Sequence, residues 1–263
     1  MYSSCRFRHS FYLEGMTTYF KIPFDDKDAA KAMGARYSAD AECWYAPTPE
    51  VEAALAQRGK PTTPLVPIMA FQGEDQTFGS TPKLALDLIP STCWFTNVRS
   101  CVSQDDWKRI AMGVKRRANK RCECCGGVAD PANKVFLEPH ERFDYRNGVQ
   151  ALRRLVCACS RCHLSLHFGH ARATGREDEA REWLAQVNGW DKAQVDAAID
   201  AAFAQWAERS RQDWTLDLSI IEGAGVVVRL PTRAQRAEKG VNLNEVHPRA
   251  QSGEDFMRSL GLL

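Results

Sequence analysis

The chain has 263 residues, 44% of them hydrophobic, and a formal net charge of +2. These values are typical of a globular protein with one or two packed domains, and the charge by itself gives no indication of nucleic-acid binding. No apolar run reaches the roughly 18 residues of a membrane span, so no membrane partner is expected. The first residues lack the apolar segment of a secretory signal, which predicts a cytoplasmic protein.

Residues 1–16 have no clear pattern and are expected to form an N-terminal extension. Residues 17–58 predict a small α+β domain, beginning with a strand over the alternating residues 18–24. Asp25 or Asp26 then precedes a short helical pattern that ends at a glycine. A hairpin over residues 35–45 and a helix between residues 47 and 58 complete the predicted domain.

Within this domain, the runs Phe24-Asp-Asp-Lys27 and Ala30-Lys-Ala-Met-Gly-Ala35, together with Trp44-Tyr45, resemble a small domain of unknown function found on plasmid primases and conjugation proteins. The resemblance covers about residues 18–47. It implies a mobile-element or DNA-processing context and a possible protein partner. Trp44 and Tyr45 have two interpretations, a small hydrophobic core or an aromatic surface that stacks on nucleic-acid bases.

Residues 59–82 contain Gly, Pro, Thr and Gln without a period, which predicts a linker to a second domain over residues 83–230. In that domain Ser103 and Asp106 form a capping-box pattern that opens a helix. The buried face of this helix is expected to hold Trp107, Ile110, Ala111 and Val114.

The rest of this helix and the residues after it are strongly basic. The basic cluster is either a solvated face or a patch that contacts DNA phosphates beside a metal site. Two arginines further along the chain extend the same cluster. The candidate nucleic-acid-binding residues are Lys108, Lys115, Arg116, Arg117, Lys120, Arg121, Arg153 and Arg154.

Two C-x-x-C pairs follow the basic helix. Four thiolates from two such pairs make a closed tetrahedral zinc site, which is a structural arrangement. In a chain without a secretory signal, such cysteines are typical of metal ligands rather than of disulfides. Cys124 and Cys157 compete for the same ion, but the spacing favours a structural Zn²⁺ held by Cys122, Cys125, Cys159 and Cys162.

Three histidines lie near these cysteines in the sequence. His163 and His167 are four residues apart, so they share one face of a helix that begins after Cys162. His140 lies on a strand expected around residues 134–140. Together they predict an open second site for a divalent cation such as Zn²⁺, Ni²⁺, Mn²⁺ or Mg²⁺. Alternatively, His163 replaces one thiolate, and the other two histidines lie around that site or at the surface.

The C-terminal part predicts helices over residues 179–187 and after Asp191, then strands at 214–219 and 226–230. Residues 231–263 are polar and predict a flexible tail. The helix after Asp191 carries an apolar stripe that predicts packing, made of Val195, Ala198, Ile199, Ala202, Phe203 and Trp206.

The cysteine and histidine pattern resembles the HNH family, the ββα-metal nucleases, in which a zinc-stapled variant is common. The resemblance runs from about residue 86 to 218 and includes the flanking runs Asn188-Gly-Trp190 and Trp214-Thr-Leu-Asp-Leu-Ser219. It implies a metal-dependent endonuclease, a hydrolase that cuts phosphodiester bonds in DNA.

In this family a hydrophobic-Glu-x-His-His run ends the first strand, with one histidine as metal ligand and the next as general base. Here the run is Leu137-Glu-Pro-His-Glu141, so the resemblance places His140 on the metal ligand and Glu141 on the base. Glu138 competes for the role of base, because alternation along a strand places it on the same face as His140. The family's asparagine has no counterpart, since Arg153 and Arg154 stand near its place.

These predictions describe an α+β protein with a small N-terminal strand–helix–hairpin domain, a linker and a zinc-stapled ββα-metal core flanked by helices. The first functional hypothesis is a metal-dependent DNA nuclease with Glu141, Glu138 and His140 as catalytic candidates. The second is a catalytically degenerate zinc module that binds nucleic acid or protein, which the missing histidine and asparagine favour.

Overall fold

A computed structural model of the chain describes residues 18–38, 41–94, 96–232, 234, 235 and 238. The expected N-terminal extension and nearly all of the expected tail lie outside these residues. The chain forms two compact units, one up to Val66 and one from Pro67, and each is described by itself. None of the helices that the structure describes combines the length and the apolar character needed to cross a bilayer.

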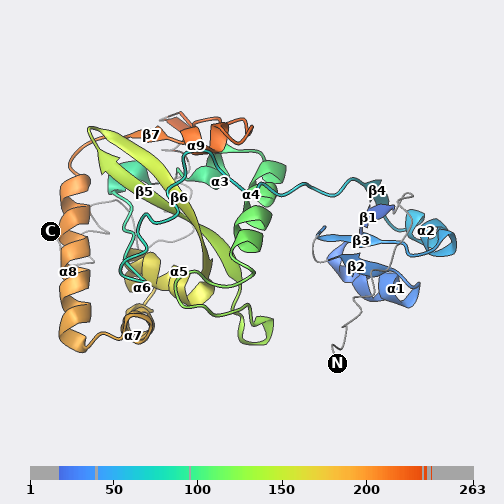
Figure 1. Ribbon diagram of the computed structural model, residues 1–263, viewed down its shortest axis with the longest axis horizontal. Coiled ribbons are helices and arrows are strands. Elements are labelled where there is room, and N and C mark those ends of the chain that lie inside the picture. Colours follow the sequence, from blue (N-terminus) through green and yellow to red (C-terminus); the bar gives the residue numbers. More distant parts are fainter. Residues whose placement is uncertain (1–17, 39–40, 95, 233, 236–237, 239–263) are drawn as a thin grey trace, which may run out of the picture. The chain divides into compact units, whose positions relative to one another are not determined.

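The N-terminal unit is an antiparallel sheet of four short strands with helices on one face (Figure 1). Phe20 and Trp44 lie opposite each other on the helical face and are buried with Ala30 and Leu55. The strand order is β2-β3-β1-β4. The elements are β1 (Tyr19–Lys21), α1 (Lys27–Ala32), β2 (Arg36–Ser38), β3 (Cys43–Tyr45), α2 (Pro49–Ala56) and β4 (Lys60–Thr62).

The stretch expected to be a linker, residues 59–82, is instead part of both units. Its first residues form β4, which pairs with β1 and closes the first sheet. Further on, Ile68 and Phe71 are buried in a core of the second unit, which therefore begins at Pro67 rather than at residue 83. Ile68 and Phe71 lie in the apolar run Leu65-Val-Pro-Ile-Met-Ala-Phe71, which Pro67 interrupts and which has neither a helical nor a strand period, so their burial was not predicted.

A long hairpin, β5 (Leu137–Arg146) and β6 (Val149–Cys159), forms the centre of the second unit, and the short strand β7 (Thr215–Asp217) pairs in parallel with β6. The strand expected around residues 134–140 is longer than predicted, since β5 continues to Arg146. The turn that joins the strands is Asn147-Gly148, with positive φ at both residues. This dipeptide is the commonest signal for a two-residue hairpin.

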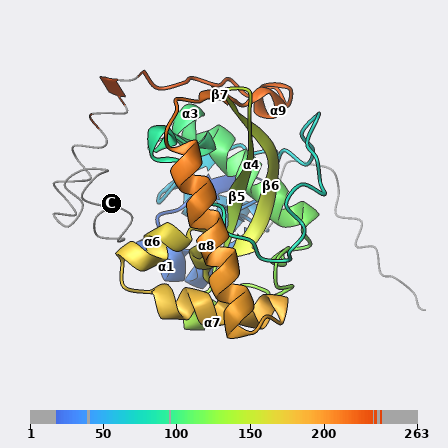
Figure 2. The same cartoon turned by 90° about the vertical axis from the view of Figure 1, so that its left-hand side faces the viewer.

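The hairpin separates two hydrophobic cores (Figures 1 and 2). On one face, Val156 and Ala158 pack with helices α5 to α8; this is the α5 face. On the other, Leu155 and Cys157 pack with residues of α4 and α9; this is the α4 face. Side chains of consecutive residues point to opposite faces, so each residue of β5 belongs to one core or the other.

A β-bulge interrupts this alternation. Arg142 pairs with Arg154 and Phe143 pairs with Leu152, so Arg153 is an extra residue in β6. The backbone carbonyl of Arg153 accepts a hydrogen bond from the Asp75 amide at 3.0 Å. Because of the extra residue, Leu152 packs on the α4 face.

Two helices of the second unit, α4 and α8, begin at the capping residues that the sequence predicted. Ser103 accepts a hydrogen bond from the Asp106 amide at the start of α4, and Asp191 and Gln194 form a reciprocal capping box at α8. Residues 226–230, expected to be a strand, join no sheet. The helices are α3 (Val98–Cys101), α4 (Gln104–Arg117), α5 (Ser160–Leu166), α6 (Phe168–Ala173), α7 (Glu177–Asn188), α8 (Lys192–Arg209) and α9 (Ser219–Glu222).

Candidate metal centres

Four cysteines meet where β6 ends and α5 begins. Cys122 and Cys125 lie in the turn after α4, while Cys159 ends β6 and Cys162 lies in the first turn of α5. Their Sγ atoms all lie within 4.8 Å of one another. The structure thus confirms the four predicted cysteines as a group positioned to bind a metal ion, in an arrangement compatible with structural zinc.

The two competing cysteines do not belong to this group. Cys157 lies on the α4 face, and the thiol of Cys124 is hydrogen-bonded to that of Cys122. The hydrogen bond with Cys122 raises the pKa of Cys124 to about 12, and burial raises the pKa of Cys157 to about 12. Hydrogen bonds from neighbouring thiols, first Cys124, lower the pKa of Cys122.

Backbone and side-chain donors hold these thiols in place. The Cys122 amide donates to the Gly127 carbonyl at 2.7 Å, and Gly126 takes a positive φ in the tight turn between them. The indole N–H of Trp183 donates to Cys162 Sγ at 3.2 Å. Such hydrogen bonds orient a metal ligand and spread the charge of its thiolate.

Three histidines form a second cluster on the α5 face of the hairpin. His140 comes from β5, His163 from α5, and His167 from the junction of α5 and α6. The ring centroids lie 4.7 to 5.3 Å apart, and one nitrogen from each ring lies within 4.8 Å of the others. The structure therefore brings together all three histidines that the sequence singled out.

Asp87 fixes the orientation of His140. Its Oδ2 lies 2.9 Å from Nε2 of the completely buried imidazole, while Nδ1 of the same ring is buried without a hydrogen-bond partner among the described residues. A carboxylate on one ring nitrogen with the other left as a lone pair is the usual arrangement of a metal-binding histidine. The donor set thus fits a divalent cation, with Nδ1 of His140 as one ligand.

The sequence analysis did not single out Asp87. Burial raises its pKa, but the hydrogen bond to His140 and the charges of His140 and Arg142 outweigh burial and leave the pKa below its ordinary value. Asp87 stays ionised as a result. The available signal was a single acidic residue inside the apolar run Leu84-Ala-Leu-Asp-Leu88.

Distant side chains hold the segment that carries Asp87. The Asn188 amide bonds both the N–H and the carbonyl of Leu84, at 3.1 and 2.7 Å. The indoles of Trp94 and Trp206 both donate to the Ile89 carbonyl at 2.9 Å. The end of α7, the last turn of α8 and Trp94 therefore set the position of one carboxylate beside the histidines.

His163 is oriented in the same way by Glu138. Nδ1 of His163 lies 2.9 Å from the Glu138 carboxylate, which leaves Nε2 for a metal. The hydrogen bond to His163 lowers the pKa of Glu138, and the charges of His163, Lys115 and Arg99 lower it further. Arg99, on α3, is a second residue near the site that the sequence analysis did not name.

His167 is held in the neutral form that metal binding requires. Burial lowers its pKa well below the ordinary value, and the charges of His140 and His163 act in the same direction. A neutral imidazole keeps a lone pair for a metal at a pH where an exposed histidine is protonated.

Glu141 lies on the opposite face of the hairpin from the histidines. It follows His140 on β5 before the bulge, and its carboxylate accepts a hydrogen bond from the Val98 amide at 3.1 Å, at the first turn of α3. Its proposed role as base came from its place in the sequence run. The pleat of the strand places Glu138, rather than Glu141, beside the histidines.

The candidate DNA-contacting cations fall into two groups. Arg117 forms a buried ion pair with Glu74 and also donates to the Leu155 carbonyl, and Arg154 pairs with Glu123 at 2.8 Å. These two arginines stabilise the interior. Lys120 and Arg121 are exposed after α4, and Lys115 lies close enough to Glu138 to affect its pKa. The remaining candidates are half-buried: Lys108, Arg116 and Arg153.

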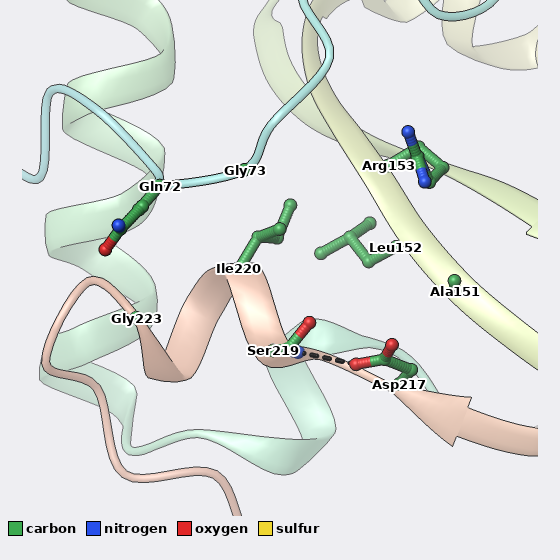
Figure 3. A pocket seen from close by; sticks show the side chains of 9 residues that line it. All are labelled: Gln72, Gly73, Ala151, Leu152, Arg153, Asp217, Ser219, Ile220 and Gly223. Carbon is green, nitrogen blue, oxygen red and sulfur yellow. Dashed lines mark hydrogen bonds between the residues drawn. The ribbon is translucent and has the colours of Figure 1, made fainter.

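A separate hollow of about 300 Å³ lies beside α9 and the end of β7 (Figure 3). Figure 3 shows Gln72 and Gly73 on one side of it and Arg153 on the other, with the Asp217 carboxylate accepting the Ser219 amide. None of the histidines or cysteines described above lines this hollow.

Comparison with known proteins identifies one segment. A family model described as a domain of unknown function (DUF5710) matches residues 17–58, which confirms the resemblance expected for this part of the chain. No HNH family model matches the second unit. No curated protein and no solved structure matches the chain.

Proposed function

We propose that the second unit is a metal-dependent nuclease of the HNH type that hydrolyses phosphodiester bonds in DNA. The observation that carries the proposal is the convergence of three imidazoles, two of which are oriented by a carboxylate on their outer nitrogen. Closed structural sites do not need such a set, because four thiolates complete the coordination of the ion. Three neutral ligands leave coordination positions for water and a phosphate oxygen.

The two sites have separate roles in this proposal. The four cysteines hold a structural Zn²⁺ that joins the turn after α4 to the start of α5, and so keeps His163 facing His140. The three histidines hold a second cation, for which imidazoles favour Zn²⁺, Ni²⁺ or Mn²⁺ over Ca²⁺. His140, His163 and His167 would hold this cation, and the chemistry it would supply when bound is Lewis-acid stabilisation of the scissile phosphate and activation of water.

The protein's own part in the reaction is orientation and charge. Asp87 and Glu138 fix the ring nitrogens of His140 and His163, and Lys115 and Arg99 add positive charge near the Glu138 carboxylate. Glu138 lies 2.9 Å from His163 and is the proposal's candidate for accepting a proton from water. Its lowered pKa makes it a weak base, so the proposal assigns it mainly to positioning His163.

DNA contact is assigned to the cations around the end of α4. Lys115, Arg116, Lys120 and Arg121 follow one another there, whereas Arg117 is paired with the buried Glu74 and Arg154 with Glu123. Neutralised phosphates release counterions, so affinity for duplex DNA should fall steeply with salt. A mobile-element context, which the resemblance of residues 18–47 implies, is part of the proposal; the match of residues 17–58 to DUF5710 supports the resemblance.

The test is cleavage of supercoiled plasmid by the full chain with Mg²⁺, Mn²⁺, Ni²⁺ or Zn²⁺ added in turn. Wild type is compared with His167→Ala and with His170→Ala, a matched control three residues further on, on an exposed part of α6. We expect nicked or linear DNA with wild type and the control and none with His167→Ala. Equal cleavage by all three, or none by wild type with any cation, contradicts the proposal.

A second function is favoured by one observation. Glu141, which stands where the HNH family has its base, is hydrogen-bonded to α3 on the far face of the hairpin. A chain without that base is a zinc-stapled module that binds DNA or protein without cutting. Salt-sensitive DNA binding with intact plasmid under every metal condition supports this second function.

A further inference from the structure

One face of the N-terminal sheet carries two tyrosines and three cations, and neither of the helices α1 and α2 described for residues 18–38 and 41–66 packs on it. Directly paired residues share a face, so Arg36, Tyr45, Tyr19 and Thr62 form one row across all four strands. Lys21 and Lys60 are paired in the next row. We call this surface the tyrosine face; its residues are Tyr19, Lys21, Arg36, Ser38, Cys43, Tyr45, Lys60 and Thr62.

The helices pack on the opposite face. Phe20 and Trp44, which alternate with the tyrosines along β1 and β3, are 1% and 8% exposed and pack with Ala30 and Leu55. Trp44 therefore forms the small core that was one of its two interpretations. Tyr19 and Tyr45 are only half-buried, with ring centroids 6.1 Å apart. The hydrophobic core of this unit is thus complete without the two tyrosines.

The four strands carry only positive charge, whereas the helical side carries acidic residues together with Lys27 and Lys31 of α1, and Glu42 lies in the turn between β2 and β3. The four strands contain Lys21, Arg36 and Lys60 and no acidic residue, and all three cations are exposed. The acidic residues of the covering side lie in α1, α2 and the turn before α1: Asp25, Asp26, Asp28, Glu50 and Glu52. The unit has nearly equal numbers of positive and negative side chains, but its open sheet surface is positive. That surface is complementary to a polyanion.

We propose that the tyrosine face binds single-stranded nucleic acid, with Tyr19 and Tyr45 stacking on bases and Lys21, Arg36 and Lys60 contacting phosphates. Stacking on aromatic rings requires bases that are free of a complementary strand, and flanking cations track the backbone. Four-stranded sheets with exposed aromatic residues are a known form of such a platform. A duplex buries the faces of its bases, so the tyrosines give it no contact.

The inference is independent of the nuclease proposal, because it concerns the other unit. It is tested in the full chain by fluorescence anisotropy with a labelled 20-nucleotide oligo-dT, an oligo-U of the same length and a labelled duplex. The key variant is Tyr19→Ala/Tyr45→Ala. Its conservative counterpart, Tyr19→Phe/Tyr45→Phe, keeps the rings, and circular dichroism checks that both variants fold.

We expect the alanine pair to weaken binding to the single strands about ten-fold or more, since each stacked base contributes about 5- to 150-fold. The phenylalanine pair should bind within about two-fold of wild type. Duplex affinity should stay unchanged. Tyr37→Ala is the matched control, since this tyrosine is 52% exposed on the helical face of β2.

The cations are tested by the salt dependence of single-strand binding. Neutralising Lys21 and Lys60 to glutamine should reduce the magnitude of the slope of log K against log salt by about 0.7 for each lost contact. Lys31→Gln, on the outer side of α1, is the control. The inference is overturned if the alanine pair leaves single-strand affinity unchanged. It is also overturned if the alanine pair weakens duplex binding equally, or if Tyr37→Ala weakens single-strand binding as much.

Discussion

Oδ2 of Asp87 lies 2.9 Å from Nε2 of His140, and so joins a segment far upstream of the hairpin to the histidine cluster. The bond fixes the tautomer of a buried ring. It also explains why runs outside the cysteine and histidine motif belong to the site, since Asn188 and Trp206 hold the segment that carries Asp87.

Replacing Asp87 should therefore weaken the histidine site selectively. For Asp87→Ala we expect a loss of about 10- to 100-fold in affinity for the second cation, the usual effect of removing the partner of a metal-bound histidine. Titration with Mn²⁺ or Ni²⁺ measures this loss, and the zinc content of the cysteine site should not change. Asp105→Asn, on an exposed part of α4, is the control; an equal loss there would show that the effect is nonspecific.

The two glutamates of β5 should respond differently. Glu138→Gln should reduce metal affinity or cleavage by about 10- to 100-fold, because His163 loses its charged partner. Glu141→Gln should change cleavage by less than two-fold or so, because its carboxylate contacts α3, while Glu141→Ala should lower the free energy of unfolding by about 1 kcal/mol. Stronger inhibition by Glu141→Gln than by Glu138→Gln would contradict the orientation of β5 described above.

Arg117 should matter for stability rather than for DNA. Its partner Glu74 has a side chain only 1% exposed and also accepts the Leu155 amide at 2.8 Å. Arg117→Gln leaves this carboxylate buried and unpaired, so the free energy of unfolding should fall by about 3–5 kcal/mol. Urea unfolding measures it. Lys120→Gln should change it by less than about 0.5 kcal/mol, and Arg117→Met with Glu74→Leu should recover much of the loss.

The cysteine assignment predicts a sharp difference between neighbours. Cys122→Ser and Cys162→Ser should lose the structural zinc and fail to fold, because zinc binding is coupled to folding. Cys124→Ser and Cys157→Ala should each keep one zinc per chain, whatever their melting temperature. Plasma emission spectroscopy measures the zinc content of each variant. If Cys124→Ser loses the ion, Cys124 is a zinc ligand and the assignment is wrong.

Acidification should destabilise the protein through His167. Its folded-state pKa is lowered, so the unfolded chain takes up a proton at this residue as the pH falls through about 6.5 while the folded chain does not. The free energy of unfolding should decrease by up to about 1 kcal/mol per pH unit below that point and be unaffected above it. Urea unfolding at pH 7.5, 6.5 and 5.5 compares wild type with His167→Gln, without added second metal. If the difference in free energy of unfolding between wild type and His167→Gln is the same at all three pH values, this account is wrong.

The sequence predicted the metal ligands and most helices because their signals are local. Two C-x-x-C pairs, histidines four residues apart and the caps at Ser103 and Asp191 each depend on spacing within a turn or two. The Asn147-Gly148 dipeptide also indicates where the hairpin turns, and therefore how far its two strands extend. The partner of His140 was not predictable in this way, since Asp87 is held beside it by contacts of its segment with the distant helices α7 and α8.

The role of Glu141 shows the limit of a linear motif. Position in a family run places it one residue after the metal ligand, whereas the pleat of a strand sends that residue to the other core. Alternation alone favoured Glu138, and the contact with His163 agrees with it. In the N-terminal unit the same alternation separates Trp44, in the core, from Tyr45, on the outer face.

The bulge at Arg153 has a consequence for how this protein tolerates changes in length. The extra residue changes which face the side chains on the turn side of the bulge point to. Residues inserted or removed near the Asn147-Gly148 turn therefore leave His140 facing α5. One residue inserted between Leu137 and His140 instead turns the imidazole into the apolar core under α4 and brings Pro139 to the place of the ligand. Changes in length near the turn of the hairpin are therefore compatible with the histidine site, whereas an insertion between Leu137 and His140 destroys it.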